Sequence, residues 1–261
     1  MWIDKEVYTS HIKDGEKIIK MRRILDKIDI VINRHLTQTT DFLDPYEVRL
    51  GESILNRFAD INYIQYGGYS NSERKIIIIF PNYLKIDNPE EYLYCVKVSG
   101  DLDKLSHKDY LGALLSLGIK REKIGDILVH NDYSYIIVKE EIGDFVLYNL
   151  KKIGNKNINT QNTCFTKIEI PLVEYKEIKR FLTSLRIDLV IASTYNISRN
   201  DSMDIIKKGF VKINWEPIDK SAREVSEGDV ISVRGYGRFI LHSIEGLSRK
   251  GRFISNIRIL I

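Results

Sequence analysis

Residues 186–235 read RIDLVIASTYNISRNDSMDIIKKGFVKINWEPIDKSAREVSEGDVISVRG, and this stretch decides the fold of the C-terminal part of the chain. Its apolar residues recur at helical spacing over 186–195, which predicts a helix there. Ser198, with Asp201 three residues later, is typical of a capping box that opens a second helix. Two short strands are predicted to follow, over 210–213 and 230–234. The stretch is therefore expected to fold as a small α+β unit.

Basic side chains gather at the second predicted helix and at the strand that leaves it. Lys207 and Lys208 lie in the last turn of that helix, where the helix dipole favours cations, and Gly209 fits the left-handed position that ends a helix. Arg199 lies near the start of the helix, where exposed backbone N–H groups can meet a phosphate. The predicted nucleic-acid contacts of this segment are Arg186, Ser198, Arg199, Lys207, Lys208, Lys212, Asn214 and Arg234.

The order of these parts resembles the S4 RNA-binding domain. The matching residues are Arg186-x-Asp188, Ser198-Arg199, Lys208-Gly209, Val211-x-Ile213-Asn214 and Gly228-Asp229-x-Ile231. One departure is Trp215-Glu216, where many S4 domains have a glycine-rich turn. The alternative to this interpretation is an α+β domain whose lysines only face solvent.

The excess positive charge of the chain is concentrated in its C-terminal part. The 261 residues carry a formal net charge of +4. Residues 181–261 hold 13 Lys and Arg against 9 Asp and Glu, whereas residues 1–180 hold 27 of each. The whole excess therefore lies in the S4-like segment, which favours a polyanionic partner there. The hydrophobic content of 43% and the charged content of 29% are ordinary for a soluble globular protein.

The cysteines and histidines give no sign of a metal or a cofactor. Cys95 and Cys164 lie in apolar runs without zinc-ligand spacing, so we expect two buried, reduced thiols. The charged N-terminal residues 1–16 lack the apolar core of a secretion signal, and the aliphatic run 76–80 is too short to cross a membrane. We therefore expect a cytoplasmic monomer without cofactors. No histidine pair has metal-ligand spacing among His11, His35, His107, His130 and His242.

The first part of the chain is predicted to be a small α/β domain over residues 1–83. Residues 14–34 have an apolar stripe at helical spacing, and Asp44-Pro45 is a typical helix start. Two strands are expected after the second helix, over 61–66 and 75–80, joined by a turn at Gly67-Gly68.

The middle of the chain is predicted to be a second domain, over residues 84–175, ahead of the S4 domain at 183–261. The order β-α-β-β-α-β is that of the ferredoxin-like fold, which RNA-recognition motifs share. The strands are expected at 92–98, 124–129, 133–138 and 164–170, and the helices at 107–117 and 140–151. Bases could stack on the strand tyrosines, although tyrosines in strands more often pack against the protein. These tyrosines are Tyr92, Tyr94, Tyr133 and Tyr135.

Along its whole length the chain resembles the YlmH family. The resemblance is carried by the phrase DPYEVRLGESILNRF (44–58), the Gly67–Tyr69 turn, the segment 107–127 and the S4-like stretch. It implies a protein that binds structured RNA, in particular the large ribosomal subunit and tRNA, in the rescue of stalled large subunits during ribosome-associated quality control. A role in cell division, as an adaptor that binds RNA only incidentally, stays open. A second RNA contact is predicted at His107, Lys108, Lys120, Arg121 and Lys123.

Catalytic motifs are missing from the sequence. Pseudouridine synthases share the S4 domain and carry a Gly-Arg-Leu-Asp phrase, but in this chain Gly100-Asp101-Leu102-Asp103 has an acid in place of the arginine. The signature motifs of tyrosyl-tRNA synthetases, the P-loop and the nucleophile elbow are also absent from the sequence. The sequence therefore predicts a binding protein rather than an enzyme.

Overall fold

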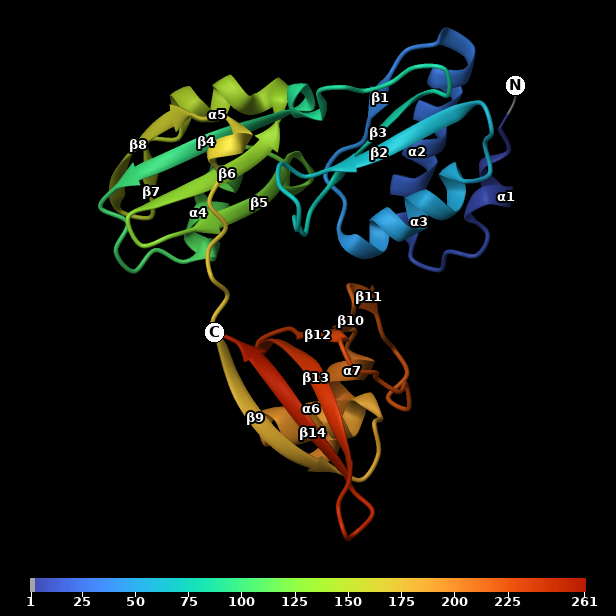
Figure 1. Ribbon diagram of the computed structural model, residues 1–261, viewed down its shortest axis with the longest axis vertical. Helices are drawn as coiled ribbons and strands as arrows, with labels where there is room; N and C mark the ends of the chain where they lie inside the picture. The colour runs from blue at the N-terminus through green and yellow to red at the C-terminus, as the bar shows by residue number, and fades with distance from the viewer. Residues whose placement is uncertain (1–2) are drawn as a thin grey trace. The chain divides into compact units, whose positions relative to one another are not determined.

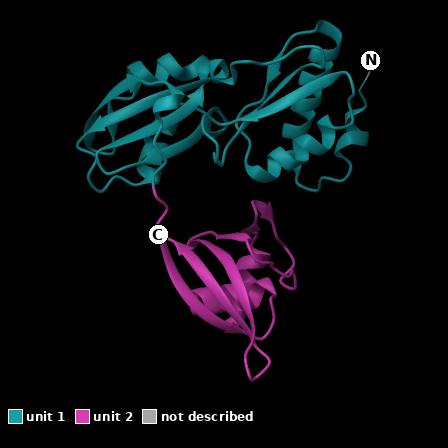
Figure 2. Ribbon diagram, in the orientation of Figure 1, with its two compact units in different colours: residues 1–171 teal, residues 172–261 magenta. Residues whose placement is uncertain are grey.

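The computed structural model describes residues 3–261, which divide into two compact units (Figure 2). Unit 1 comprises residues 1–171 and unit 2 residues 172–261. Met1 and Trp2, which begin the segment expected to carry no secretion signal, lie outside the described residues. Unit 2 holds 16 Lys and Arg against 11 Asp and Glu, whereas unit 1 holds 24 against 25. The excess positive charge predicted for the C-terminal part therefore belongs to unit 2.

The first half of unit 1 is a helical layer on a small antiparallel sheet. Its strands lie in the order β1-β3-β2. As predicted, Asp14 caps one long helix, and Asp44 and Glu47 form a capping box on the next, which has proline in its first turn. The elements are α1 (Lys5–Thr9), α2 (Gly15–Arg34), β1 (Gln38–Thr39), α3 (Pro45–Leu55), β2 (Ile61–Tyr66) and β3 (Ile76–Pro81).

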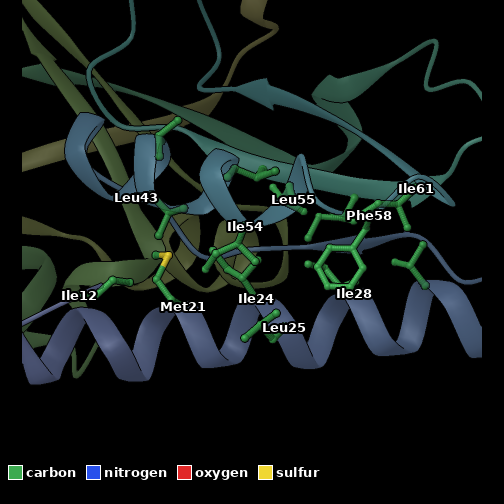
Figure 3. Packing of buried hydrophobic residues seen from close by; sticks show 14 residues of the cluster. Ile12, Met21, Ile24, Leu25, Ile28, Leu43, Ile54, Leu55, Phe58 and Ile61 are labelled. Carbon is green, nitrogen blue, oxygen red and sulfur yellow. The ribbon is translucent and has the colours of Figure 1, made fainter. Parts of the chain in front are cut away.

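Helix α2 supplies most of the core of this half. Its buried residues recur every three or four positions, from Met21 through Leu25 and Ile28 to Val31, and all four are fully inaccessible to solvent. They pack against α3, from which Ile54 points toward α2 (Figure 3). This amphipathic stripe is the one predicted from the sequence.

The second half of unit 1 has ferredoxin-like topology. Its antiparallel sheet has the strand order β5-β6-β4-β8-β7, so the first and third strands of the fold are central. The α-helices are α4 (His107–Ser116) and α5 (Gly143–Asn149). The strands are β4 (Leu93–Gly100), β5 (Ile124–Val129), β6 (Tyr133–Lys139), β7 (Lys152–Ile153) and β8 (Lys156–Asn162). Short 3-10 helices occur at Pro89–Tyr92, Arg121–Lys123, Glu140–Ile142 and Phe165–Lys167.

The last strand of this half lies earlier in the chain than predicted. Residues 164–170 were expected to form it, but the strand beside β4 is β8, and Phe165–Lys167 is a 3-10 turn. Strand β8 reads KNINTQN and buries only Ile158, so it lacks the apolar pattern from which strands are predicted. Cys164 is exposed, which corrects the expectation of two buried thiols, whereas Cys95 is buried as predicted.

The two halves of unit 1 share a hydrophobic core. One face of β3 packs against the face of the ferredoxin-like sheet that does not carry α4 and α5. Since these side chains come from both predicted domains, the division at residue 83 does not separate two independent cores. The buried residues of this core are Phe42, Ile76, Ile78, Phe80, Leu93, Cys95, Leu128, Tyr135 and Ile137.

A buried polar network also joins the two halves. The carboxylate of Asp126 on β5 accepts hydrogen bonds from the Tyr69 hydroxyl at 2.8 Å and from the backbone N–H groups of Glu73 and Arg74 at 2.7 and 3.0 Å. The Arg74 guanidinium in turn donates to the carbonyl of Phe42 at 3.0 Å. Polar groups satisfied in this way rigidify the junction.

Unit 2 is a six-stranded antiparallel sheet with two helices packed on one face (Figure 1). The strand order is β11-β10-β12-β13-β14-β9. Strand β9 precedes the predicted start of the S4 domain at 183 and pairs with β14 along its full length. The elements are β9 (Tyr175–Leu182), α6 (Ile187–Tyr195), α7 (Arg199–Lys207), β10 (Val211–Ile213), β11 (Glu216–Pro217), β12 (Val230–Val233), β13 (Gly237–Leu247) and β14 (Phe253–Leu260).

Candidate nucleic-acid interface

Two of the predicted contact residues, Arg186 and Arg199, meet on one buried carboxylate. Arg186 is the N-cap of α6, and its Nε and Nη2 atoms donate to the two carboxylate oxygens of Asp188, each at 3.1 Å. Arg199 opens α7, and its Nε donates to Asp188 Oδ2 at 2.9 Å. The Asp188 side chain is fully buried, whereas the arginine side chains keep 34% and 50% of their surface exposed. Asp188 thus holds two guanidinium groups side by side at the surface.

The electrostatics of this group favour a fixed arrangement. Burial raises the pKa of Asp188, but the hydrogen bonds and positive charges of Arg186 and Arg199 lower it by more, so its pKa lies below the ordinary value. The carboxylate therefore stays ionised and keeps both arginines in place. The Ser202 hydroxyl donates to the Asp188 backbone carbonyl at 2.7 Å, which ties α7 to α6 at the same point.

The start of α7 is capped as the sequence predicts. The Ser198 hydroxyl accepts a hydrogen bond from the backbone N–H of Asp201 at 3.0 Å, and the Asp201 carboxylate accepts from the Ser198 backbone N–H and hydroxyl. The hydroxyl of Ser198 is therefore already hydrogen-bonded to Asp201 at the start of the helix. This terminus therefore presents Arg199 to solvent beside a local acidic group.

A second cluster of predicted contacts lies where α7 runs into β10. Lys207 and Lys208 are exposed at the end of the helix, which Gly209 closes at a φ of +72°. The backbone N–H of Arg234 donates to the Phe210 carbonyl at 2.9 Å, and the Arg234 guanidinium lies 5.0 Å from the centre of the Phe210 ring. The hydrogen bond fixes Arg234 beside the end of α7. The three cations thus form an exposed basic edge.

Lys212 and Asn214 lie apart from this edge. Lys212 lies between the buried Val211 and Ile213 on β10, so its side chain faces away from α6 and α7. Asn214 follows at the far end of β10, where its side-chain amide donates to Asp229 at 2.7 Å and accepts from the Val230 N–H at 2.9 Å. The side chain of Asn214 therefore ties the β10–β11 turn to the start of β12.

The β10–β11 turn brings Trp215 to Arg238, a contact that the sequence interpretation did not predict. Ile213 pairs with Glu216, so Asn214 and Trp215 form a two-residue turn, with φ values of +48° and +66°. Such turns favour glycine at the second position, and tryptophan is strained there. The Arg238 guanidinium lies 5.5 Å from the centre of the Trp215 ring. The departure noted at this turn is therefore a cation–π pair on the sheet face that bears Lys212.

The second predicted RNA contact, in unit 1, is only partly available. His107, Lys108 and Lys120 are exposed. Arg121 instead donates to the backbone carbonyl of Ile124 at 2.6 Å, and burial lowers its pKa to about 10. Lys123 forms ion pairs with Asp41 at 2.6 Å and with Glu141. The structure therefore exposes His107, Lys108 and Lys120 to solvent, but it engages Arg121 and Lys123 in contacts within the protein.

The sheet face on which RNA-recognition motifs stack bases is largely covered in this chain. Tyr135 is 3% exposed and belongs to the core shared with β3. Its hydroxyl donates to the Lys167 carbonyl at 3.1 Å, and the Tyr133 hydroxyl donates to Glu169, so the segment after β8 crosses the same face. Packing, the commoner role of strand tyrosines, therefore accounts for Tyr135.

The described part of the chain also lacks two features that would point to other kinds of site. Within residues 3–261, no helix is both long and apolar enough to cross a membrane. The same residues contain no group of three or more His, Cys, Asp or Glu side chains that could hold a metal ion.

Comparison with known proteins places these features in a family. The family model "YlmH, N-terminal" matches residues 16–84, the model "Putative RNA-binding domain in YlmH" matches 89–167, and the S4 domain model matches 185–231. A Bacillus subtilis (strain 168) protein named "Ribosome-associated protein quality control protein P2" is 32% identical over 250 residues, which are 95% of this chain and 96% of the relative. The chain belongs to the YlmH family. The S4 match of this YlmH-family chain spans both arginines of the Asp188 group and the exposed end of α7.

A solved structure shares the fold. The "Cell division protein ylmH from Streptococcus pneumoniae" aligns with a TM-score of 0.52 at 21% identity, over 60% of this YlmH-family chain and 97% of that chain. At this identity the likeness concerns the fold alone.

Proposed function

We propose that this YlmH-family chain is a non-enzymatic protein that docks on structured RNA of the large ribosomal subunit, and on tRNA, through its S4 domain. In this role it acts in the cytoplasm, as a monomer, in the quality control of stalled large subunits. The relative of 32% identity, which is named for ribosome-associated quality control, supports the process. The S4 match supports RNA as the ligand.

The observation that carries the proposal is the pair of arginines on Asp188. A buried carboxylate shared by two partly exposed guanidinium groups fixes their position, leaves a net positive charge and does not consume all of their donors. Arginine donors held in a fixed geometry suit the oxygens of a phosphate. The edge formed by Lys207, Lys208 and Arg234 would extend the cationic surface along the backbone.

The non-enzymatic part of the proposal rests on the loop that holds Asp101 and Asp103, which is similar in sequence to the synthase phrase. Both residues are exposed, and Asp101 forms an ion pair with Lys156 at 2.8 Å. A catalytic aspartate would instead need a pocket that holds a base beside it.

A double substitution, Lys207→Ala with Lys208→Ala, tests the docking surface. Each removed phosphate contact releases about one fewer counterion, so the slope of log affinity against log salt should fall by about two. We expect affinity for purified large subunits to drop about tenfold or more at moderate salt. Co-sedimentation of the full chain with the subunits, repeated over a salt series, measures both quantities.

Lys250→Ala is the matched control, because Lys250 is also an exposed lysine of unit 2 and lies in the β13–β14 hairpin away from α7. It should bind like the unmodified chain. Equal binding by the double variant and the control would refute the assignment of the surface. If the chain is instead a cell-division adaptor that binds RNA only incidentally, the unmodified chain should not sediment with the large subunits and should stay at the top of a sedimentation gradient.

A further inference from the structure

Unit 1 contains a cleft that the proposed S4-domain function does not use. Its volume is about 600 Å³, and it lies between α2 and β1 on one side and the end of β6 on the other. This volume is typical of small-molecule sites. The charged residues along the cleft are Arg23, Asp26, Lys27, Asp41, Lys123, Lys139 and Glu141.

The feature that distinguishes the cleft is the ammonium group of Lys139. Lys139 is 5% exposed, and its Nζ donates to the Thr39 hydroxyl at 2.6 Å and to the Thr40 carbonyl at 3.2 Å. Both partners are neutral, so this buried cation has no carboxylate in direct contact among residues 3–261. Burial of an ammonium without a counterion is costly, and burial lowers the pKa of Lys139 to about 8.

The carboxylates nearest to Lys139, those of Asp41 and Glu141, act on its ammonium through space rather than by direct contact. The nearby carboxylates of Asp41 and Glu141 are both engaged by Lys123. Asp26 pairs with Lys5 at 2.5 Å.

On α2, two further cations line the cleft. Lys27 has no ion-pair partner among the described residues, whereas Arg23 forms an ion pair with Glu122 at 3.4 Å through one of its terminal nitrogens. Arg23 and Lys27 are four residues apart, so they share a helix face. The charged side chains along the cleft are four basic and three acidic, which leaves a surplus of one positive charge.

We propose that this cleft binds a phosphate-bearing nucleotide, with Lys139, Lys27 and Arg23 as the contacts of the phosphate. Tyr92 and Ile30 line the same cleft and offer apolar surface to a base or sugar, and Gln38 adds an amide for hydrogen bonds. A desolvated cation beside two more exposed ones is the arrangement that strengthens phosphate binding. The ligand is either a free nucleotide or the phosphorylated end of an RNA strand.

The test measures binding of adenosine 5′-monophosphate to the full chain by NMR titration, with adenosine as the phosphate-free comparison. Lys139→Met and Lys27→Gln should each weaken the affinity about tenfold, since each removes one charge-assisted contact. Lys13→Gln, at an exposed lysine ahead of α2, should leave it unchanged. The Lys207→Ala, Lys208→Ala variant should also bind the nucleotide normally, which separates this site from the proposed RNA surface.

A second pair of probes identifies the source of the nucleotide. A short oligoribonucleotide is compared with and without its 5′-phosphate, and a phosphate-dependent gain that Lys27→Gln removes indicates an RNA end. A monophosphate that binds without such a gain indicates a free nucleotide. Lys27 is only half-buried, so its variant keeps the test valid even where Lys139→Met fails to fold. The proposal is overturned if Lys27→Gln binds both phosphorylated probes like the unmodified chain, or if adenosine binds as tightly as its monophosphate.

Discussion

At the scale of single residues, Asp188 does the most to organise the predicted surface. Its carboxylate has no exposed area, and two arginines from the starts of α6 and α7 converge on it. The two arginines therefore have a structural role as well as the proposed RNA role. An arginine-to-alanine variant would leave the buried Asp188 carboxylate with one arginine partner instead of two, so its loss of binding would not by itself report an RNA contact.

The titration of Asp188 gives a test of that structural role. The pKa of Asp188 is lower in the folded chain than the ordinary value of about 3.9, because the two arginines outweigh burial. A lowered folded pKa contributes stability that is present above the unfolded pKa and is lost as pH falls through the folded value. We therefore expect the stability of unit 2 to decline as pH falls below about 4.

Asp188→Asn removes this contribution. The variant should lower the free energy of unfolding of unit 2 by about 2 kcal/mol at pH 7, because it loses hydrogen bonds to charged groups. Its deficit should shrink as pH falls, since the unmodified chain loses the same contribution. Denaturant titrations followed by Trp215 fluorescence, in a Trp2→Phe background, report on unit 2. A deficit of constant size down to pH 3 would contradict the structural role of Asp188. Glu245 also has a lowered pKa, but it is present in both chains, so its titration cancels when the variant is compared with the unmodified chain.

At the scale of elements, the sequence predicts what short-range rules determine. Apolar periodicity and caps located α2, α3, α6 and α7, because each signal lies within one or two helical turns. Strand β8 was missed because most of its side chains are polar. It forms a strand through its backbone pairing with β4, which leaves no apolar pattern in the sequence. Residues 164–170 alternate like a strand, yet they cross the sheet face, since the place beside β4 is already taken.

The same distinction holds for the candidate site. Arg186, Arg199 and the end of α7 were recognisable from their positions in a motif, whereas the burial of Asp188 depends on the packing of α7 against α6. Arg121 and Lys123 looked equally suitable for phosphate, but the first half of unit 1 brings Asp41 to Lys123, a contact over 82 residues of sequence. No local pattern encodes such a contact.

Close packing of Gly125 on β5 against Phe42, in the loop before α3, leads to a prediction at the same scale. A Cβ atom at Gly125 would lie 2.7 Å from the Phe42 ring and 3.1 Å from the Ile137 carbonyl. Gly125→Ala should therefore destabilise unit 1 by about 1–3 kcal/mol through overpacking. Gly112→Ala is the control, because Gly112 lies inside α4 with open space around it and should stabilise the helix by about 1 kcal/mol. Thermal unfolding of both variants measures the difference. If Gly125→Ala is no less stable than Gly112→Ala, the close packing of Gly125 against Phe42 is refuted.

At the scale of the whole molecule, the chain matches three domain models but forms two compact units. Each unit has its own core, and unit 2 carries the excess positive charge. Within unit 1, β3 and Phe42 cover the sheet face of the ferredoxin-like half. The predicted domains at 1–83 and 84–175 are therefore expected to fold as one body.

Fragments of the chain test that expectation. A fragment of residues 84–171 would expose five side chains of the shared core, namely Leu93, Cys95, Leu128, Tyr135 and Ile137. Full burial of an apolar side chain contributes about 1.5–3 kcal/mol, so the combined loss is comparable to the whole stability of a small domain, about 5–15 kcal/mol. The fragment should lack cooperative unfolding and bind a hydrophobic dye, whereas fragments 1–171 and 172–261 should each unfold cooperatively. A sharp unfolding transition and a dispersed NMR spectrum for 84–171 would show instead that the ferredoxin-like half is stable without the first 83 residues, and the shared core would then be an interface between two domains.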